Sequence, residues 1–338
     1  MTVRIIHNLT QAQYNSRAYV TIGVFDGIHR GHQQLVGGMV KAAHSAGNVA
    51  VVVTFDPHPV AALGYDPPPL MTTVEERAEL LAPLELDLLV ALPFTRATAH
   101  TSATDFVELL LQHLGLLELW GGPDFALGHR REGDIPFLRR LGAERGFTVH
   151  TVEPLVWEGG LISSSRVRAA LEAGDIPQAT GCLGHPYRLV GVVVQGRGMG
   201  HSLGTPTANL SIQQPERLLP AGGVYACVAH TERPGAYPAV VNVGVRPTFA
   251  GRTLTVEAHL LDSDADLYDQ RLALDFIARL RDERSFSTAD ALVEQIHKDI
   301  AQARDVLGVD APSTGCSQEA AKGARTRDMQ FLVVGRTP

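Results

Sequence analysis

The sequence predicts an α/β domain built on a parallel sheet, followed by a mainly β domain built as an antiparallel barrel. Continuous apolar strands alternate with helical segments as far as about residue 175, a rhythm typical of a parallel sheet covered on both faces. After residue 186, strand-like segments separated by turn residues follow one another, which favours a barrel. A length of 338 residues is sufficient for two domains with cores of ordinary size.

Five strands alternate with helices in the first half of the chain. The expected strands cover residues 19–25, 48–55, 87–92, 116–120 and 146–152. The expected helices begin at residue 29, cover 75–81 and 104–114, and follow the serines at 163–165. Because ligands of such sheets bind beyond the carboxyl ends of the strands, we expect a site in the loops that follow them.

The stretch 20–33, VTIGVFDGIHRGHQ, is the first of these loops. An apolar strand leads into a turn at Asp26, and His29 and His32 share one face of the helix that opens behind it. Three glycines leave space for phosphates beside the backbone: Gly23, Gly27 and Gly31. A helix N-terminus attracts phosphate, and two imidazoles can donate hydrogen bonds to a leaving pyrophosphate. A strand–turn–helix whose histidines only pack remains the alternative for this motif alone.

Three further segments of the first half suit ligand binding. The prolines of residues 56–59 force an extended loop after the second strand, and residues 121–128 follow the fourth. Serines 163–165 can cap a short helix, and the same groups can hold phosphate with Arg168 as a bidentate partner. A plain helix cap with solvated arginines is the alternative interpretation of this last segment.

The second half begins after a predicted domain boundary at 174–186, where glycine and proline recur. The expected strands cover residues 188–194, 223–229, 239–243, 253–260 and 271–276. Apolar residues at helical spacing predict a helix over 288–307. Residues 310–338 are small and polar, which predicts a flexible tail with a short docking strand at 331–334.

Three stretches of the second half carry groups suited to phosphate chemistry. A glycine-rich segment can wrap phosphates with backbone N–H groups: Gly196, Gly198, Gly200 and Gly204. The Thr207 hydroxyl and the Asn209 amide are hard oxygen donors suited to Mg²⁺. Glu257 and His259 share one strand face, and the Glu257 carboxylate can take a proton from an alcohol. Ordinary turns and a solvated glutamate are the alternative for each stretch alone.

Composition and charge exclude several classes of protein. A formal net charge of −7 and the lack of a basic block argue against a nucleic-acid binder. The chain start has no apolar signal segment, and no run approaches the ~18 apolar residues of a membrane span. The three cysteines are far apart, which suits a reducing compartment and gives no zinc spacing. We therefore expect a cytoplasmic protein without nucleic-acid or membrane partners, and a homo-oligomer stays open.

Four motifs of the first half occur in one order: GVFDGIHRGH, TFDPHP, PDFALGHRREGD and ISSSRVRAAL. Together they resemble the adenylyltransferase half of the bacterial bifunctional riboflavin kinase/FAD synthetase family, a member of the nucleotidyltransferase superfamily. The resemblance implies that His29 and His32 contact the phosphates of ATP. It places the rest of that site in two segments: Gly23, Phe25, Asp26, Gly27 and Gly31, and then Ser163, Ser164 and Arg168. It places beside the flavin Asp56, Pro57, Asp124 and Phe125.

Six motifs of the second half resemble the riboflavin kinase domain of the same family: GxxxGxxLGxPTAN, GGVYA, NVGVRPTF, VEAHLLD, DADLY and RDERSF. The resemblance implies that Thr207 and Asn209 bind Mg²⁺ and ATP phosphates, and that Glu257 is the general base on the ribityl 5′-hydroxyl. It implies that two loops lie near the ligands, with Asn242, Arg281 and Phe286 beside the flavin. Thr205 departs from the bulkier apolar residue usual at its position.

The resemblance implies an FMN adenylyltransferase domain over 1–180, a riboflavin kinase domain over 181–309 and a tail over 310–338. The implied reactions phosphorylate riboflavin to FMN with ATP and then adenylylate FMN to FAD, releasing pyrophosphate. Leu161 stands where similar proteins usually carry Arg or Lys, and Ser165 where they usually carry Thr. Two alternatives stay open: a riboflavin kinase whose adenylyltransferase activity is weakened or lost, and a non-catalytic flavin-binding regulator.

Overall fold

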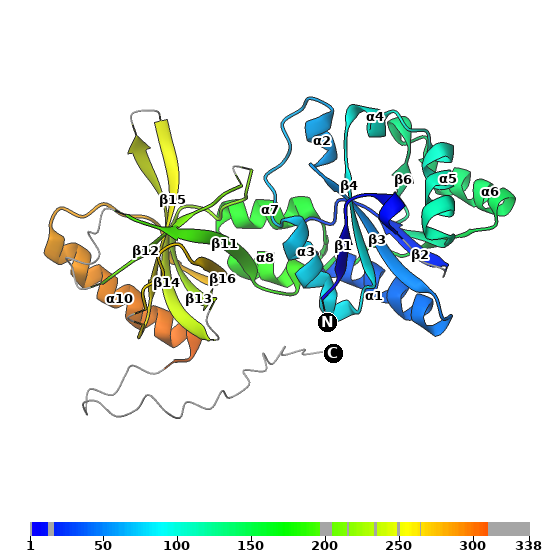
Figure 1. Cartoon of the computed structure of the whole chain (residues 1–338). Coiled ribbons are helices and arrows are strands. Elements are labelled where there is room, and N and C mark those ends of the chain that lie inside the picture. The colour runs from blue at the N-terminus through cyan, green and yellow to red at the C-terminus, as the bar shows by residue number, and fades with distance from the viewer. Residues whose placement is uncertain are drawn as a thin grey trace.

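The computed structural model describes residues 2–12, 17–196, 205–214, 216–232, 235–248, 251–263 and 265–309. Figure 1 shows two lobes that lie side by side, with the N-terminal sheet in one lobe and the barrel in the other. Helices α7 (Ser164–Ala173) and α8 (Ile176–Leu183) lie where the two lobes meet. The predicted succession of a parallel sheet and an antiparallel barrel is confirmed.

The N-terminal lobe is built on a six-stranded sheet of order β1-β4-β3-β2-β5-β8, in which every neighbouring pair is parallel. The strands are β1 (Arg4–Ile6), β2 (Ala18–Ile22), β3 (Val49–Asp56), β4 (Leu88–Pro93), β5 (Leu116–Gly121) and β8 (Thr148–Thr151). The edge strand β1 was not predicted, because three residues carry too little pattern to detect. Strand β2 ends at Ile22 and not at residue 25, since Phe25 turns the chain with a φ of 52°.

Helices cover both faces of this sheet, as its continuous apolar strands require. On one face α1 (Arg30–Ser45) and α3 (Val74–Leu81) pack against alternate residues of the strands, such as Val52 and Leu89. On the other face α5 (Ala103–Leu114) and α6 (Ile135–Arg145) pack against the residues between them, such as Val51 and Leu88. Alternate side chains of each strand therefore pack into two separate cores, one on each face of the sheet.

Short elements complete this lobe. They are the helices α2 (Pro59–Ala62) and α4 (Arg96–Ala99), the strand pair β6 (Ala126–Leu127) and β7 (Gly133–Asp134), the strand pair β9 (Val156–Trp157) and β10 (Gly160–Leu161), and 3₁₀ turns at Leu9–Gln11, Ala82–Leu84 and His129–Arg131. Several of these follow strand ends of the main sheet. They build the walls of the cavity described below.

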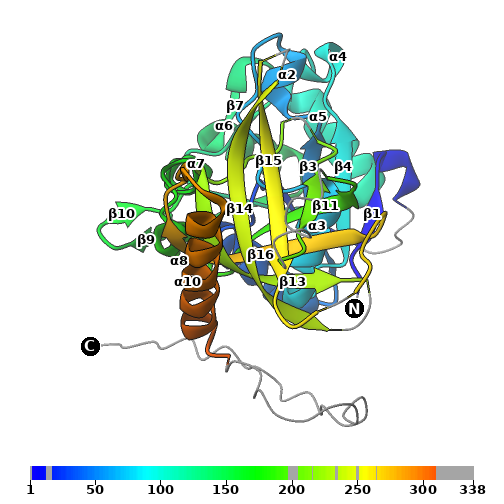
Figure 2. The same ribbon diagram turned by 90° about the vertical axis from the view of Figure 1, so that its left-hand side faces the viewer.

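The second lobe is a closed barrel of order β11-β12-β15-β14-β13-β16 with antiparallel neighbours. Its strands are β11 (Tyr187–Val194), β12 (Ala208–Ser211), β13 (Gly223–Thr231), β14 (Ala236–Thr248), β15 (Gly251–Leu260) and β16 (Arg271–Arg281). Strand β12 was not predicted; it has four residues and follows the glycine-rich segment. The last helix α10 (Ala289–Leu307) lies along the outside of the barrel beside β13 and β14 (Figure 2).

No helix within the described residues is long and apolar enough to cross a membrane.

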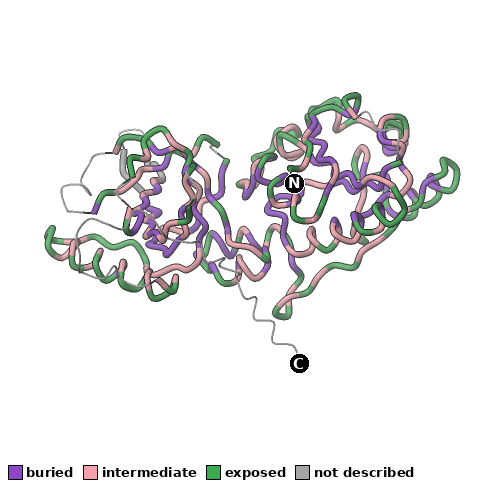
Figure 3. Tube along the Cα trace, turned by 60° about the horizontal axis from the view of Figure 1, so that its bottom comes forward, coloured by how far each residue is buried: buried purple, intermediate pink, exposed green. Residues whose placement is uncertain are grey.

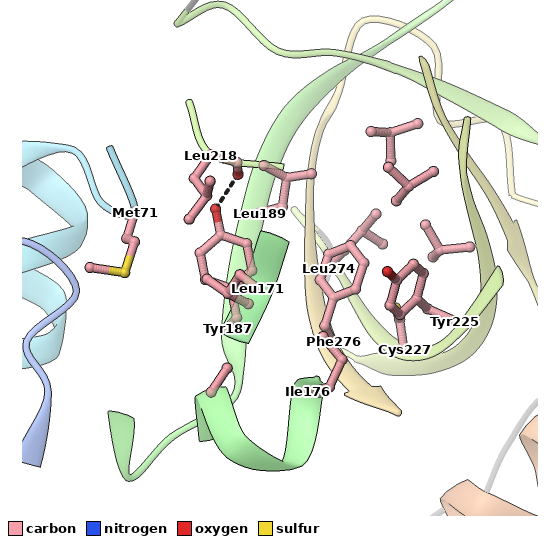
Figure 4. Packing of buried hydrophobic residues seen from close by; sticks show 14 of the residues in the cluster. Met71, Leu171, Ile176, Tyr187, Leu189, Leu218, Tyr225, Cys227, Leu274 and Phe276 are labelled. Atoms are coloured by element: carbon pink, nitrogen blue, oxygen red, sulfur yellow. Dashed lines mark hydrogen bonds between the residues drawn. The ribbon is translucent and has the colours of Figure 1, made fainter. Parts of the chain in front are cut away.

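The barrel core extends outward to α7 and α8. Leu171 and Ile176 of these helices belong to the same buried cluster as Tyr225 and Phe276 inside the barrel (Figure 4). The tube in Figure 3 shows buried chain running through both lobes and through the region between them. The predicted domain boundary at 180 falls inside α8, between residues that pack in one core.

A second connection between the lobes is made by the segment before α3. The backbone of Leu70 accepts a hydrogen bond from the N–H of Leu218 (2.9 Å) and donates one to the carbonyl of Glu216 (2.7 Å). Behind this bridge, Glu76 forms a buried ion pair with Arg217, which also donates to the carbonyl of Arg188 at 2.6 Å. The two lobes are therefore fixed to one another by backbone pairing and by a buried charge pair.

We expect Arg217→Met to lower the free energy of unfolding by about 3–5 kcal/mol, because Glu76 would remain buried without its ionic partner. Adding Glu76→Gln to the same chain removes that charge and should recover part of the loss. Equilibrium unfolding in guanidinium chloride measures both variants. An Arg217→Met chain as stable as the wild type would contradict the stabilising role of this ion pair.

Candidate active sites

Asp26 joins three segments beneath the loop that follows β2. Its buried carboxylate accepts hydrogen bonds from the backbone N–H of Met71 (3.0 Å) and Thr72 (2.9 Å) and from the Thr72 hydroxyl (3.0 Å). It also pairs with the Arg168 guanidinium of α7 at 2.7 Å. Both residues were predicted to lie at phosphates, and here they bind each other. A role of either residue toward phosphate stays a prediction.

The two predicted histidines lie together at the start of α1. His29 is the N-cap, and its Nδ1 accepts the backbone N–H of His32 at 3.2 Å. The two imidazoles stack with their centroids 3.6 Å apart, and Phe25 meets His32 edge-on at 4.9 Å. A neutral imidazole that accepts through Nδ1 carries its proton on Nε2. The helix start therefore presents an aromatic cluster with hydrogen-bond donors.

Burial keeps both imidazoles uncharged at neutral pH. It lowers the pKa of His29 from its ordinary value of 6.5 to about 4. The pKa of His32 lies well below its usual range, first because of burial and then because of the neighbouring His29 and Arg77. The Nδ1 of His32 is buried without a hydrogen-bond partner within the described part of the chain. The pair can therefore donate to an anion without bringing a permanent charge of its own.

The glycines of this loop make room for the protein's own side chains. Gly27 has a φ of 80°, and a Cβ there would collide with the Met71 side chain. A Cβ on Gly23 would press on the Phe25 ring, and one on Gly31 would press on the His29 ring. The predicted contact of these glycines with phosphates stays a prediction, and their packing role is independent of it.

A cavity of about 740 Å³, which we call cavity 1, opens at the carboxyl ends of four strands of the sheet. Its wall is formed by the residues that end or follow these strands: Ile22, Gly23, Phe55, Phe94 and Phe125. The predicted residues Gly23 and Phe125 therefore lie in one cavity. Asp56 and Pro57, joined by a cis peptide bond, stand between its lining residues Phe55 and Pro59. Asp124 adjoins it, and its carbonyl accepts from Arg131 at 2.7 Å.

Four basic residues that line cavity 1 were missed by the sequence analysis: His100, His129, Arg130 and Arg131. The two imidazoles stack at 5.1 Å, and each Nδ1 donates to a backbone carbonyl, which can only accept. Arg130 and Arg131 have φ values of 52° and 60°, a conformation that side chains seldom adopt. The HRR sequence after Gly128 was the available signal for these residues. The direction in which the two arginine side chains point depends on the positive φ of this turn, which the sequence does not reveal.

The serines of the second predicted phosphate signature cap α7. Ser163 is the N-cap and accepts the backbone N–H of Arg166 at 3.3 Å, while the Ser164 hydroxyl donates to the carbonyl of Asp26 at 3.1 Å. This second bond places the start of α7 beside the first loop. Leu161 is 59% exposed on β10, where it pairs with Val156. Its side chain is therefore turned largely to solvent.

In the barrel, strand pairing brings four predicted residues into one row. Glu257 of β15 is paired with Asn209 of β12 on one side and with Asn242 of β14 on the other. The row continues through Val224 of β13 to Arg281 of β16. Directly paired residues project to the same face of a sheet. The neighbours of Glu257 along its strand, Val256 and Ala258, lie in the barrel core, so the row faces outward.

A cavity of about 340 Å³, cavity 3, lies between this row and α10. Five predicted residues line it: Thr207, Asn242, Glu257, Arg281 and Phe286. Its apolar lining comes from β14 and α10: Val240, Leu292, Ile296 and Ile300. Thr205, noted above for its departure from an apolar residue, is buried and also lines this cavity.

Arg281 anchors α10 at the end of cavity 3. Its guanidinium forms a bidentate ion pair with the buried Asp299, with contacts of 2.9 and 2.7 Å. Gln295 donates to the same carboxylate at 2.8 Å, and the Phe286 ring lies 5.8 Å from the guanidinium carbon. In this structure Arg281 therefore positions the wall of the cavity, and direct flavin contact stays a prediction.

A third cavity, cavity 2, has a volume of about 620 Å³ and shares Thr207 with cavity 3. It is lined by Val193, Leu260, Leu267 and Tyr268 among others. The segment that separates the cavities is fixed by His259, whose Nδ1 donates to the carbonyl of Pro206 at 2.8 Å. The sequence analysis predicted neither this contact nor cavity 2.

The Asn209 side chain packs against Gly196, where a Cβ would collide with its amide. Gly198, Gly200 and Gly204 lie outside the described residues. Among the residues that are described, no group of three or more His, Cys, Asp and Glu could hold a metal ion. The carboxylate paired directly with Asn209 is that of Glu257, and Glu283 and Asp299 also line the cavity that Thr207 borders.

Two family models match the chain: one described as FAD synthetase over residues 11–166 and one described as riboflavin kinase over residues 183–307. Curated relatives named bifunctional riboflavin kinase/FMN adenylyltransferase match nearly the whole chain. The protein from Escherichia coli K12 is 36% identical over 315 residues, covering 92% of this chain and 99% of the relative. Those from Pseudomonas fluorescens and Bacillus subtilis are 37% and 32% identical, covering 89% and 88% of this chain and 96% and 94% of the relatives.

A solved structure described as a macrolide-efflux protein from Streptococcus pneumoniae has the same fold. It superposes with a TM-score of 0.83 at 30% sequence identity, covering 90% of this chain and 99% of that protein. This likeness extends over both lobes and their junction.

We expect the N-terminal lobe to lose stability as the pH falls from about 6.5 to about 4. The unfolded chain takes up a proton on His29 near its ordinary pKa of 6.5, whereas the folded chain takes it up only at about 4. Titration of His29 should therefore lower the free energy of unfolding by on the order of 3 kcal/mol across this window, and His32, whose pKa is also lowered, adds a loss of the same sign. Urea titrations followed by the fluorescence of Trp120 and Trp157 measure the change.

His29→Asn is the matched control for this pH dependence, because asparagine caps a helix and does not titrate. Its stability should fall less than that of the wild type between pH about 7 and about 4.5. An equal loss in both proteins would contradict the assignment to His29.

Proposed function

The chain belongs to the family of bifunctional riboflavin kinase/FMN adenylyltransferases, and we propose here how its residues divide the two reactions. It is an enzyme of flavin cofactor biosynthesis that phosphorylates riboflavin to FMN and adenylylates FMN to FAD. Its substrates are riboflavin, FMN and ATP, and its products include FAD and pyrophosphate. Both family models match, so neither the kinase-only alternative nor the non-catalytic alternative gains support.

For the kinase reaction, we propose that cavity 3 holds riboflavin and cavity 2 holds the nucleoside of ATP. The apolar wall of cavity 3 suits the isoalloxazine ring, and Tyr268 and Leu267 of cavity 2 suit a base. Thr207 lines both cavities, so the transferred phosphate would lie beside it. The Glu257 carboxylate then accepts the proton of the ribityl 5′-hydroxyl, whose oxygen forms a bond to the γ-phosphorus of ATP. The bond from that phosphorus to the bridging oxygen of the β-phosphate breaks, and ADP leaves.

Mg²⁺ is the metal that we propose for this site, held by Thr207 and Asn209. The donors fit, because Mg²⁺ prefers oxygen ligands and is usually bound by one or two protein groups together with substrate phosphates. When bound, it would neutralise charge on the ATP phosphates. The protein's own contribution is positional: Asn209 lies in β12 and Thr207 directly precedes that strand, and the pairing of β12 with β15 places Asn209 beside Glu257.

For the adenylyl transfer, we propose that FMN lies in cavity 1 and that the ATP triphosphate lies at the start of α1. An oxygen of the FMN phosphate forms a bond to the α-phosphorus of ATP, and the bond from that phosphorus to the pyrophosphate oxygen breaks. His29 and His32 donate hydrogen bonds to the departing pyrophosphate. The nucleophile is already an anion, so the reaction requires no covalent enzyme intermediate.

The remaining assignments are proposals of the same kind. We propose domains at 1–180 and 181–309, a cytoplasmic location and small-molecule substrates as the partners. Free, buried Cys182 and Cys227 are in keeping with a reducing compartment. Sedimentation analysis of the purified chain would establish whether it forms a homo-oligomer.

The observation that carries the kinase assignment is the outward row of Asn209, Glu257 and Asn242, in which Glu257 and Asn242 line cavity 3. We expect Glu257→Gln to abolish FMN formation from riboflavin while FAD formation from supplied FMN continues at the wild-type rate. Chromatography of the flavins after incubation with ATP and Mg²⁺ measures both reactions. If both activities fell together in a folded variant, the division into two sites would be wrong.

The matching test for the first lobe is the double variant His29→Asn, His32→Gln. It keeps the helix cap but removes both imidazoles, so we expect FAD formation from FMN to fall by about 10²–10³-fold. Phosphorylation of riboflavin by the same preparation should be unchanged. A double variant that still made FAD at the wild-type rate would remove the histidines from the mechanism.

A further inference from the structure

We propose that Arg77 of α3 is a positioning residue of the adenylyl-transfer site, which holds the Val24–Gly27 turn from below and makes the site attractive to a triphosphate. The inference rests on the proposed adenylyl transfer at the start of α1. Arg77 belongs to none of the motifs that identified the site. In the sequence it lies within EERAELL, where it resembles a solvated helix residue.

The Arg77 guanidinium is buried beneath the loop and bound to two threonines. Only 3% of the residue is exposed. Its Nη1 donates to the Thr54 hydroxyl at 3.2 Å, its Nε to the Thr72 hydroxyl at 3.3 Å, and its Nη2 to the Thr72 carbonyl at 3.2 Å. All three acceptors are neutral oxygens.

Each threonine hydroxyl that is bound to Arg77 also forms a hydrogen bond with one end of the turn. The Thr54 hydroxyl donates to the carbonyl of Val24 at 2.8 Å. The Thr72 hydroxyl accepts the backbone N–H of Gly27 at 2.9 Å and donates to the Asp26 carboxylate at 3.0 Å. One planar guanidinium therefore fixes both ends of a turn that contains Phe25, with its positive φ, and Asp26. This turn leads directly into the two histidines.

The buried charges around Arg77 do not balance. The carboxylate of Asp26 is paired with Arg168, and that of Glu76 is paired with Arg217. Within the described residues no carboxylate forms a salt bridge with Arg77. The Arg77 guanidinium interacts electrostatically with Asp26 and Glu76, which are the two paired carboxylates, and with Asp56, which is exposed to solvent. Three arginines therefore face two carboxylates in the buried network.

An excess positive charge in a buried network is costly unless an anion offsets it. The site that the turn leads to is the start of α1, where free N–H groups already favour an anion. Arg77 is also near enough to His32 to contribute to the lowered pKa of that imidazole. A bound triphosphate would supply negative charge that offsets the excess positive charge of this network.

The test compares three full-length variants with the wild type. Arg77→Met removes the charge and the fork of donors at similar length, Arg77→Lys keeps the charge without the fork, and Arg139→Met removes an exposed arginine of the same lobe as a control. The measurements are KM for ATP and inhibition by pyrophosphate in FAD formation from FMN. Riboflavin phosphorylation and the unfolding midpoint without ligands are measured on the same preparations.

We expect Arg77→Met to raise KM for ATP and the inhibition constant of pyrophosphate by about ten- to a hundredfold. Its KM for FMN and its kinase activity should stay at wild-type values. Arg77→Lys should fall between the wild type and Arg77→Met, and Arg139→Met should match the wild type. The unfolding midpoint of Arg77→Met should fall because three buried hydrogen bonds are lost, but without the added cost of a buried carboxylate left without its salt bridge.

Two results would overturn the inference alone. One is an unchanged KM for ATP in Arg77→Met while the histidine double variant loses FAD formation. The other is an Arg77→Lys chain that is folded and active in riboflavin phosphorylation but as impaired toward FMN as toward ATP, which would indicate a purely structural role. A wild-type chain that formed no FAD from FMN would instead refute the proposed function.

Discussion

The structure of the N-terminal lobe and of its site depends on the buried carboxylate of Asp26. This one side chain binds the segment before α3 through Met71 and Thr72 and binds α7 through Arg168. The same segment before α3 pairs with the barrel lobe through Leu70. The loop after β2, the junction of the lobes and the start of α7 are therefore set by one connected group of hydrogen bonds.

Much of the fold could be predicted because its elements are long and their apolar patterns regular. Uninterrupted strands such as 48–55 can only be buried on both faces, and that requires a parallel sheet between layers of helices. The short strands β1 and β12 lack the length that a pattern needs. The helix α8 was hidden by Gly181, which normally indicates a turn and here admits the Trp157 ring against the helix.

The sites were predicted unevenly, for a physical reason. Glu257, Asn209 and Asn242 lie in recognisable local motifs, but only strand register makes them neighbours, and register follows from the closed barrel. Arg77 could not be found, because a charged residue on an amphipathic helix ordinarily faces water. Arg130 and Arg131 face cavity 1 only because the backbone adopts positive φ at both residues. The sequence therefore revealed which residue types are suited to the chemistry, but it did not reveal the direction in which their side chains point in the fold.

The separation of cavity 1 from cavities 2 and 3 affects the order of the chemistry. Cavity 1 shares no lining residue with cavities 2 and 3 among the residues described, and it belongs to the other lobe. With the reactions assigned to the cavities as proposed above, FMN formed beside Glu257 would leave cavity 3 and diffuse through solvent before entering cavity 1 of the same or another chain. Every molecule of the intermediate is exposed to competing FMN-binding proteins on that path. The ratio of the two cofactors is then set by this competition as well as by the two catalytic rates.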